Sequence, residues 1–180
     1  VLDEYIFDVN TGDTSYCNNF DASLGTLDFF TANTYTYFEG PSSWEKGTPT
    51  QFPGAFSPPG AWMTGLDSNY SSRDSSSLFT PVFVVDTGQA YEMTFMHQYA
   101  TERLNDGGNI QVSTDGGLSW LTIGYANEKD WYNTDFVTGL ELINPGWSDT
   151  SSGWDSARYV MSFDTDDKVI FKFWFEGNGD

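Results

Sequence analysis

The chain has 180 residues, which suits one domain with a two-layer core, and 18% of them are aromatic, which argues against disorder. Its formal net charge of -19, from 26 acidic and 7 basic side chains, argues against a nucleic-acid binder, because contact with phosphate needs Lys and Arg. The same charge argues against docking on an anionic membrane. It fits acidic loops that bind a hard cation such as Ca²⁺, or carboxylates that keep an aromatic-rich surface soluble.

The chain carries one cysteine, Cys17, so it cannot form an internal disulfide, although secreted bacterial modules often lack disulfides as well. No apolar run reaches the length of about 18 residues that a membrane span needs, so we expect no membrane insertion. No signal-peptide pattern follows Val1. We therefore expect that such a segment was removed or lies upstream in a longer protein.

Residues 1–19 predict a lead-in strand or linker, in which Leu2–Val9 has strand character and residues 10–19 are polar and rich in turn formers. Residues 34–38 predict a short strand. Residues 40–60 hold five of the seven prolines, which predicts a long irregular loop rather than the interior of a sheet. No stretch of useful length has the period of a helix.

Clearer strand patterns follow at the regular spacing that is typical of a sandwich or barrel. In the last of them, Val169, Phe171 and Phe173 share one face and Lys172 lies on the other, as in a half-buried strand. We therefore predict an all-β chain that forms an antiparallel two-sheet β-sandwich. Its predicted strands are 61–66, 77–85, 91–99, 109–113, 120–124, 136–143, 158–163 and 169–175.

A set of aromatic, acidic and glycine landmarks also runs in a fixed order along the chain. They are Phe20-Asp21, Trp44 with Gly47 and Pro49, Ala61-Trp62 with Leu66, Tyr70, Leu78, Pro81, Phe95, His97, Glu102, Asp106-Gly107-Gly108, Ser113, Asp115-Gly116-Gly117, Trp120, Gly146-Trp147 and Gly153-Trp154. This order resembles that of the MAM-like jelly-roll domains of bacterial secreted and cell-surface proteins, including the cleaved-adhesin type. The resemblance implies a jelly-roll domain over residues 20–180. The usual final strand of the family has no counterpart before Asp180, so the domain would lack that strand or take it from elsewhere.

The resemblance also implies a function, because domains of this family are non-catalytic modules for adhesion, carbohydrate binding or protein contact, often with a structural Ca²⁺. We expect a secreted or cell-surface bacterial module that is not an enzyme, belongs to a larger protein, and contacts a glycan, a surface protein or a neighbouring domain. Two alternatives stay open: a carbohydrate-active jelly-roll hydrolase or lyase, and a passive spacer or filament module. With 26 acidic residues, the sequence names no catalytic carboxylate pair.

The candidate calcium site is the acidic loop that contains Glu102 and Asp106, followed by Gly107-Gly108. Ca²⁺ takes six to eight oxygen ligands from carboxylates, carbonyls and waters, and glycines let backbone carbonyls turn toward an ion. The resemblance adds Asp21 as a third ligand. The alternative interpretation is a solvated loop in which Asp106 caps a glycine turn.

Residues 113–120 match the Asp-box pattern S-x-D-x-G-x-S-W. In this pattern Asp115 hydrogen-bonds the turn backbone, glycines take positive φ, and Trp120 packs beneath, so we predict a structural turn. The pattern also suggests a sialidase-like propeller, but that fold repeats the box in several blades and needs a longer chain.

Two further sets of residues are candidates for binding. His97, the only histidine, alternates in phase with Phe95 and Tyr99, so we expect it to pack on a sheet face rather than act as a base or metal ligand. Four aromatic residues lie in polar, glycine-rich segments and could stack on sugar rings or fold back over the ends of the sandwich, which we favour. These are Trp131, Tyr132, Trp147 and Trp154.

Overall fold

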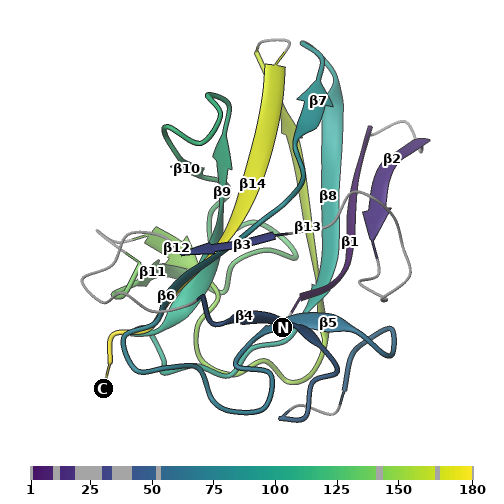
Figure 1. Cartoon of the computed structure of the whole chain (residues 1–180). Helices are drawn as coiled ribbons and strands as arrows, with labels where there is room; N and C mark the ends of the chain where they lie inside the picture. The colour runs from purple at the N-terminus through teal and green to yellow at the C-terminus, as the bar shows by residue number, and fades with distance from the viewer. Residues whose placement is uncertain are drawn as a thin grey trace.

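The computed structural model describes residues 2–9, 13–18, 30–33, 42–51, 54–140, 144–164 and 167–179. These residues form strands, turns and loops, and none of them is helical, so the described chain has no helix that could cross a membrane. The strands make two six-stranded sheets and one two-stranded sheet, and every strand pair is antiparallel (Figure 1). The predictions of an all-β chain and of antiparallel sheets are therefore confirmed.

The first six-stranded sheet, sheet A, has a central strand that begins at the second residue of the chain. β1 pairs with β8 from Leu2 to Val9, with an irregular register between Asp3 and Ile6, and with β5 at Leu2, so the first strand is an integral part of this sheet. The order is β13-β8-β1-β5-β4, and β2 pairs with β1. The strands are β1 (Leu2–Val9), β2 (Asp13–Asn18), β4 (Trp44–Gly47), β5 (Ala61–Thr64), β8 (Ala90–His97) and β13 (Asp155–Ser162).

The second six-stranded sheet, sheet B, is built around the long strand β14. Its order is β10-β9-β14-β6-β3, and β7 pairs with the first residues of β14. The strands are β3 (Phe30–Asn33), β6 (Ser75–Phe79), β7 (Phe83–Val85), β9 (Gly107–Ser113), β10 (Leu121–Thr122) and β14 (Asp167–Glu176). A separate hairpin-like pair consists of β11 (Thr134–Val137) and β12 (Asn144–Gly146).

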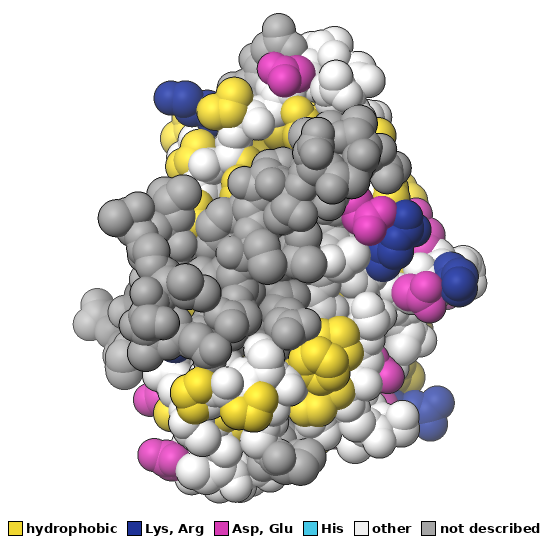
Figure 2. Space-filling view, turned by 90° about the vertical axis from the view of Figure 1, so that its right-hand side faces the viewer, with side chains coloured by type: hydrophobic (Ala, Val, Ile, Leu, Met, Phe, Trp, Pro, Cys, Tyr) yellow, Lys and Arg dark blue, Asp and Glu magenta, His cyan; other side chains and the backbone are white. Residues whose placement is uncertain are grey.

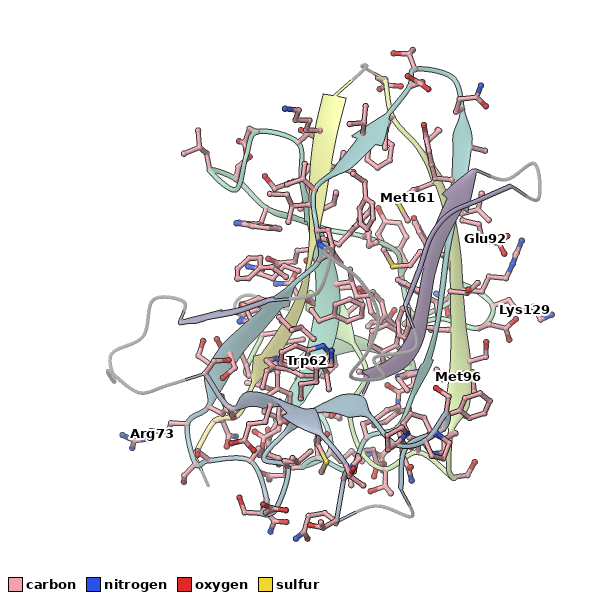
Figure 3. The ribbon with its side chains drawn as sticks, turned by 45° about the vertical axis from the view of Figure 1, so that its right-hand side comes forward. Trp62, Arg73, Glu92, Met96, Lys129 and Met161 are labelled. Carbon is pink, nitrogen blue, oxygen red and sulfur yellow. The ribbon has the colours of Figure 1, made fainter. Side chains whose placement is uncertain are left out.

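The hydrophobic core lies between sheets A and B, which face each other as the layers of a sandwich-like fold (Figure 1). Alternate residues of β8 point into it, and alternate residues of β14 meet them from the other sheet, because successive strand side chains point to opposite faces. The rings of Phe95 and Phe173 make such a contact, edge to face, with centroids 5.2 Å apart. In Figure 3, Trp62 lies between the sheets, whereas Arg73 and Lys129 point away from the molecule.

Most charged side chains lie at the surface, whereas Asp74, Asp106 and Lys172 are buried. On the face shown in Figure 2, acidic and basic side chains lie next to one another along one edge, and hydrophobic side chains gather in the lower part. The pair Arg158 and Glu92 bridges β13 and β8 on sheet A. Exposed ion pairs of this kind contribute little to stability, so the fold depends on the core.

The strand predicted at 136–143 ends at Val137, and residues 138–140 form bends. Three other predictions about elements are wrong, each for a local reason. Residues 77–85 form two strands rather than one, since Pro81 lacks the backbone N–H that a continuous ladder needs. Trp44–Gly47 forms β4 within the stretch predicted as an irregular loop, because its prolines flank these four residues without interrupting them. Asp13–Asn18 forms β2, although its residues are mostly turn formers. The predicted strand at 34–38 lies outside the described residues.

Candidate functional site

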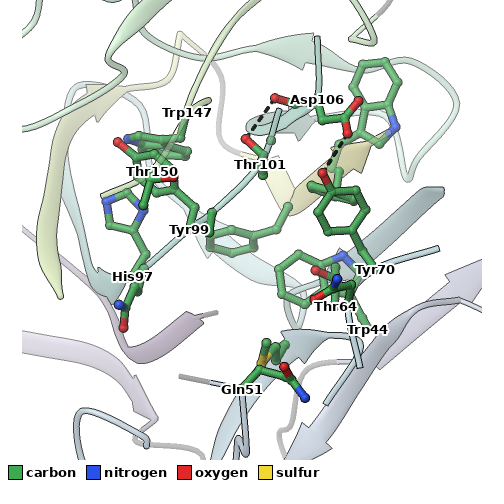
Figure 4. Close-up of a pocket in the computed structure, with 18 of the residues that line it drawn as sticks. Trp44, Gln51, Thr64, Tyr70, His97, Tyr99, Thr101, Asp106, Trp147 and Thr150 are labelled. Atoms are coloured by element: carbon green, nitrogen blue, oxygen red, sulfur yellow. Dashed lines mark hydrogen bonds between the residues drawn. The ribbon is translucent and has the colours of Figure 1, made fainter. Parts of the chain in front are cut away.

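A cavity of about 640 Å³ opens between the two sheets at one end of the sandwich. It is bounded by β4 and β5, the end of β8, the loop that follows it, and the last residues of β14. In Figure 4, His97, Tyr99 and Trp147 form one wall and Trp44, Thr64 and Tyr70 form the other. Aromatic faces and short polar groups therefore face each other across the same space.

The aromatic wall is built on a neutral histidine. The rings of His97 and Tyr99 stack at 5.5 Å with an interplanar angle of 30°, and Trp147 meets His97 edge-on at 4.7 Å. Burial lowers the pKa of His97 to about 3, so its imidazole is uncharged at neutral pH. As the sequence predicted, His97 packs against neighbouring rings. Tyr99 is only half-buried and presents its ring to the cavity.

Trp147 reaches this wall because two glycines let its backbone approach sheet B closely. Trp147 and Gly108 exchange backbone hydrogen bonds, of 2.9 Å from Trp147 N and 3.1 Å from Gly108 N. A Cβ on Gly107 would lie 2.3 Å from the carbonyl oxygen of Trp147, which no side chain tolerates. A Cβ on Gly146 would likewise lie 2.7 Å from the carbonyl oxygen of Gly108, so Gly107 and Gly146 together admit the segment that carries Trp147.

Asp106 lies at the edge of the cavity and ties several segments together. It is 3% exposed, and its Oδ2 accepts a 2.7 Å hydrogen bond from the Tyr70 hydroxyl while its Oδ1 accepts one of 2.7 Å from Asn178 N. Its carbonyl oxygen accepts bonds from Ser148 Oγ at 2.7 Å and from Thr101 Oγ1 at 3.1 Å. Burial, and then the bond to Asp106, raises the pKa of Tyr70 to about 12. Both carboxylate oxygens of Asp106 are therefore occupied.

The structure describes two of the three residues predicted to hold Ca²⁺, and these two differ in exposure. Asp21 lies outside the described residues. Glu102 is exposed, and its Oε1 accepts a 2.6 Å hydrogen bond from Asn105 Nδ2. Asp106 is buried four residues further on. Within the described part of the chain, no group of three His, Cys, Asp or Glu side chains is placed to hold a metal ion. The calcium site stays a prediction.

The four aromatic residues predicted as ligand contacts lie mostly in the core. Trp131, Tyr132 and Trp147 are buried, and the Trp147 indole donates a 3.2 Å hydrogen bond to the carbonyl oxygen of Trp131. Trp154 is half-buried and packs edge-on against the exposed ring of Phe56, with centroids 6.0 Å apart. Of the four, Trp147 lines the cavity.

The Asp-box segment forms a closed turn around Asp115. Its Oδ1 accepts hydrogen bonds from the N–H groups of Leu118 and Ser119, at 3.0 and 2.9 Å, and its Oδ2 accepts one from Ser119 Oγ at 2.6 Å. These bonds, with one from Ser113 Oγ, lower the pKa of Asp115 to about 2. Gly116 and Gly117 have positive φ, of 74° and 93°. The turn is structural, as predicted.

Sequence reasoning missed Trp44 and Tyr70 as cavity residues, and also the role of Tyr99. Trp44 lies in a segment predicted as a loop, and Tyr70 lies between two predicted strands, so neither belongs to a periodic pattern. The indole N–H of Trp44 is buried and has no hydrogen-bond partner in the described structure. Their positions arise from contacts between distant segments, which local sequence does not encode.

No family model, no curated protein and no solved structure matches this chain.

Proposed function

We propose that the chain is a non-catalytic recognition module that binds an uncharged, hydroxyl-bearing ligand, such as a sugar unit of a glycan, in the cavity between its sheets. The observation that carries the proposal is the combination of an aromatic wall with amide and hydroxyl groups around one cavity. A sugar ring has an apolar face that stacks on an aromatic ring, and hydroxyls that bond to amides and hydroxyls. Tyr99 offers the ring, and Gln51, Thr64 and Thr101 offer polar groups.

The charge of the cavity supports an uncharged ligand. Among the described residues that line it, Asp106 is the sole ionisable carboxylate, and no Lys or Arg is present. Both oxygens of Asp106 accept hydrogen bonds from the protein, and the pKa of His97 is too low for a positive charge. An ionic ligand would meet no counter-charge there, at a high cost of desolvation.

The residues that line the cavity also favour a recognition module over the alternative of a hydrolase or lyase. Hydrolysis of a glycosidic bond normally uses two carboxylates that flank the bond, one of them free to donate a proton. The described lining offers one carboxylate, and its oxygens are already engaged. If no ligand binds, the remaining interpretation is that the chain is a passive spacer.

The proposal includes a jelly-roll, MAM-like topology and a place at the bacterial cell surface or in a secreted protein. Two chain crossings support the jelly roll. The chain passes from sheet A to sheet B between β8 and β9 and again between β13 and β14, and in each sheet the corresponding strands are neighbours. This wrapping of one strand pair around another is what a jelly roll requires. The surface location is proposed from the resemblance and the acidic composition.

Calcium is also part of the proposal. An ion near Glu102 would fix the loop between β8 and β9, which supplies Thr101 and Asp106 to the cavity edge. Ca²⁺ would have to draw on Asp21, on backbone carbonyls and on water, because Ca²⁺ needs at least six oxygens.

A binding titration tests the proposed function. We would screen immobilised neutral glycans and then titrate the best binder while following tryptophan fluorescence, which Trp44 and Trp147 make sensitive to the cavity. Tyr99→Ala should weaken binding at least about tenfold, since removal of one stacking aromatic typically costs more than 1 kcal/mol. Tyr125→Ala is the matched control, because Tyr125 is 71% exposed and does not line the cavity. Absence of binding across the screen, or equal losses in both variants, would contradict the proposal.

A further inference from the structure

The loop between β5 and β6 contains a sequence that enzymes modify. Residues 67–71 read Asp-Ser-Asn-Tyr-Ser, so Asn69 is followed by Tyr70 and then by Ser71. Asn-x-Ser, where x is not proline, is the acceptor sequence for N-linked glycosylation. No other asparagine of the chain has a serine or threonine two residues later. Asp67 adds the acidic residue two positions earlier that some bacterial transferases also require.

The structure exposes the acceptor atoms of this sequence. Ser68, Asn69 and Ser71 are exposed, and no hydrogen bond engages the Asn69 side-chain amide within the described chain. Asn69 and Tyr70 have no regular secondary structure, and the Asn69 carbonyl oxygen accepts a 3.1 Å hydrogen bond from Ser68 Oγ. The amide nitrogen of Asn69 is thus free to react.

Neighbouring contacts hold the loop with Asn69 outward. Tyr70 faces inward, where its ring packs edge-on against Phe175 at 4.9 Å. Gly65 allows the close turn, since a Cβ there would lie 2.6 Å from Ser68 O. Gln51 Nε2 donates a 2.9 Å hydrogen bond to Asp67 O. The loop is therefore fixed on both sides of Asn69.

We propose that Asn69 is an acceptor for N-linked glycosylation. An oligosaccharyltransferase would use a polyprenyl-pyrophosphate-linked oligosaccharide as co-substrate. The amide nitrogen of Asn69 attacks the anomeric carbon, a C–N bond forms, and the anomeric C–O bond breaks with departure of the pyrophosphate and its electron pair. The amide proton passes to a base. Asn69 also lines the cavity, so the glycan would stand at its rim. The modification does not depend on what the cavity binds.

The test is secretion of the whole chain into the periplasm of a bacterial host that holds a transferase requiring the acidic residue, followed by intact-mass and peptide mass spectrometry. We expect a glycan-sized mass on the peptide that contains Asn69. Ser71→Ala and Asp67→Ala should each abolish it while circular dichroism shows the same fold. Asn127→Gln, which changes an exposed asparagine outside any acceptor sequence, should leave it in place. An unmodified Asn69 in the secreted chain, or full modification of Ser71→Ala, would overturn the proposal.

Discussion

The hydroxyl of Tyr70 donates a 2.7 Å hydrogen bond to Oδ2 of the buried carboxylate of Asp106. The two residues are 36 positions apart, on the loop before β6 and at the start of β9. The ring of Tyr70 packs on Phe175 of β14, and Asp106 also accepts a bond from Asn178 N. These contacts hold three segments together at the edge of the cavity. The segments are the loop before β6, the residue before β9, and the residues that follow β14.

Tyr70→Phe should destabilise the fold by about 1–3 kcal/mol, because it leaves a buried carboxylate oxygen without its donor while it keeps the ring. The measurement is urea unfolding followed by tryptophan fluorescence. Tyr125→Phe is the control, since Tyr125 is an exposed tyrosine whose hydroxyl makes no described hydrogen bond. Equal stability of Tyr70→Phe and the wild type would mean that water replaces the hydroxyl at Asp106.

Removal of calcium should lower the thermal stability if the proposed site is occupied. An ion that binds only the folded state adds about 2.7 kcal/mol at a hundredfold excess over its Kd. We expect a lower Tm in EDTA than in Ca²⁺ at constant ionic strength, and no such difference in Glu102→Ala. Asp135→Ala, at an exposed acidic residue of β11, should keep the full difference. Equal Tm values of the wild type in EDTA and in Ca²⁺ would remove calcium from the proposal.

His97 should make the fold less stable as the pH falls. Its pKa is about 3 in the folded chain and 6.5 in the unfolded chain, so between these values only the unfolded state binds the proton. The full stability is present above pH 6.5 and declines below it, by at most about 1.4 kcal/mol per pH unit. His97→Phe should flatten this decline between pH 6.5 and 4. Unfolding in urea at several pH values measures it, and identical slopes for both proteins would show that His97 is protonated in the fold.

The buried carboxyl group of Asp74 affects the stability of the fold with the opposite dependence on pH. The contribution of His97 must therefore be measured as a difference between a variant and the wild type. Burial raises the pKa of Asp74 above its usual 3.8. The folded state therefore holds this proton more tightly, and the associated stability is present below pH 3.8 and lost as the pH rises through the raised pKa. Because both His97→Phe and the wild type contain Asp74, the difference between their slopes reports His97 alone.

Asp115→Ala should loosen the turn between β9 and β10 without unfolding the sandwich. The change removes the acceptor of the Leu118 and Ser119 amides, so these amides should exchange with solvent faster. Hydrogen exchange followed by NMR measures this effect. Thr114→Ala, at an exposed neighbour, should leave the two amides protected. Unchanged protection in Asp115→Ala would show that the glycines alone hold the turn.

The sequence predicted an element correctly where that element follows from a pattern among neighbouring residues. The alternation in residues 91–99 predicted β8, and that in 169–175 predicted β14, since a half-buried strand alternates apolar and polar side chains in its own sequence. The Asp-box turn was predictable in the same way, because all its hydrogen bonds join residues at most four positions apart. The residues that determine these strands and this turn lie within the elements themselves.

The cavity could not be predicted, since it depends on contacts between segments that are distant in the chain. Tyr70 faces Asp106 from 36 positions away, and Trp147 reaches His97 only because its backbone bonds to Gly108. The sequence by itself determined an all-β, acidic, aromatic-rich chain and the phase of its strands, because these follow from composition and from a period of two. Only the tertiary structure decided which aromatic rings are buried and which groups surround the cavity, because packing between sheets depends on the register of strands across the whole chain.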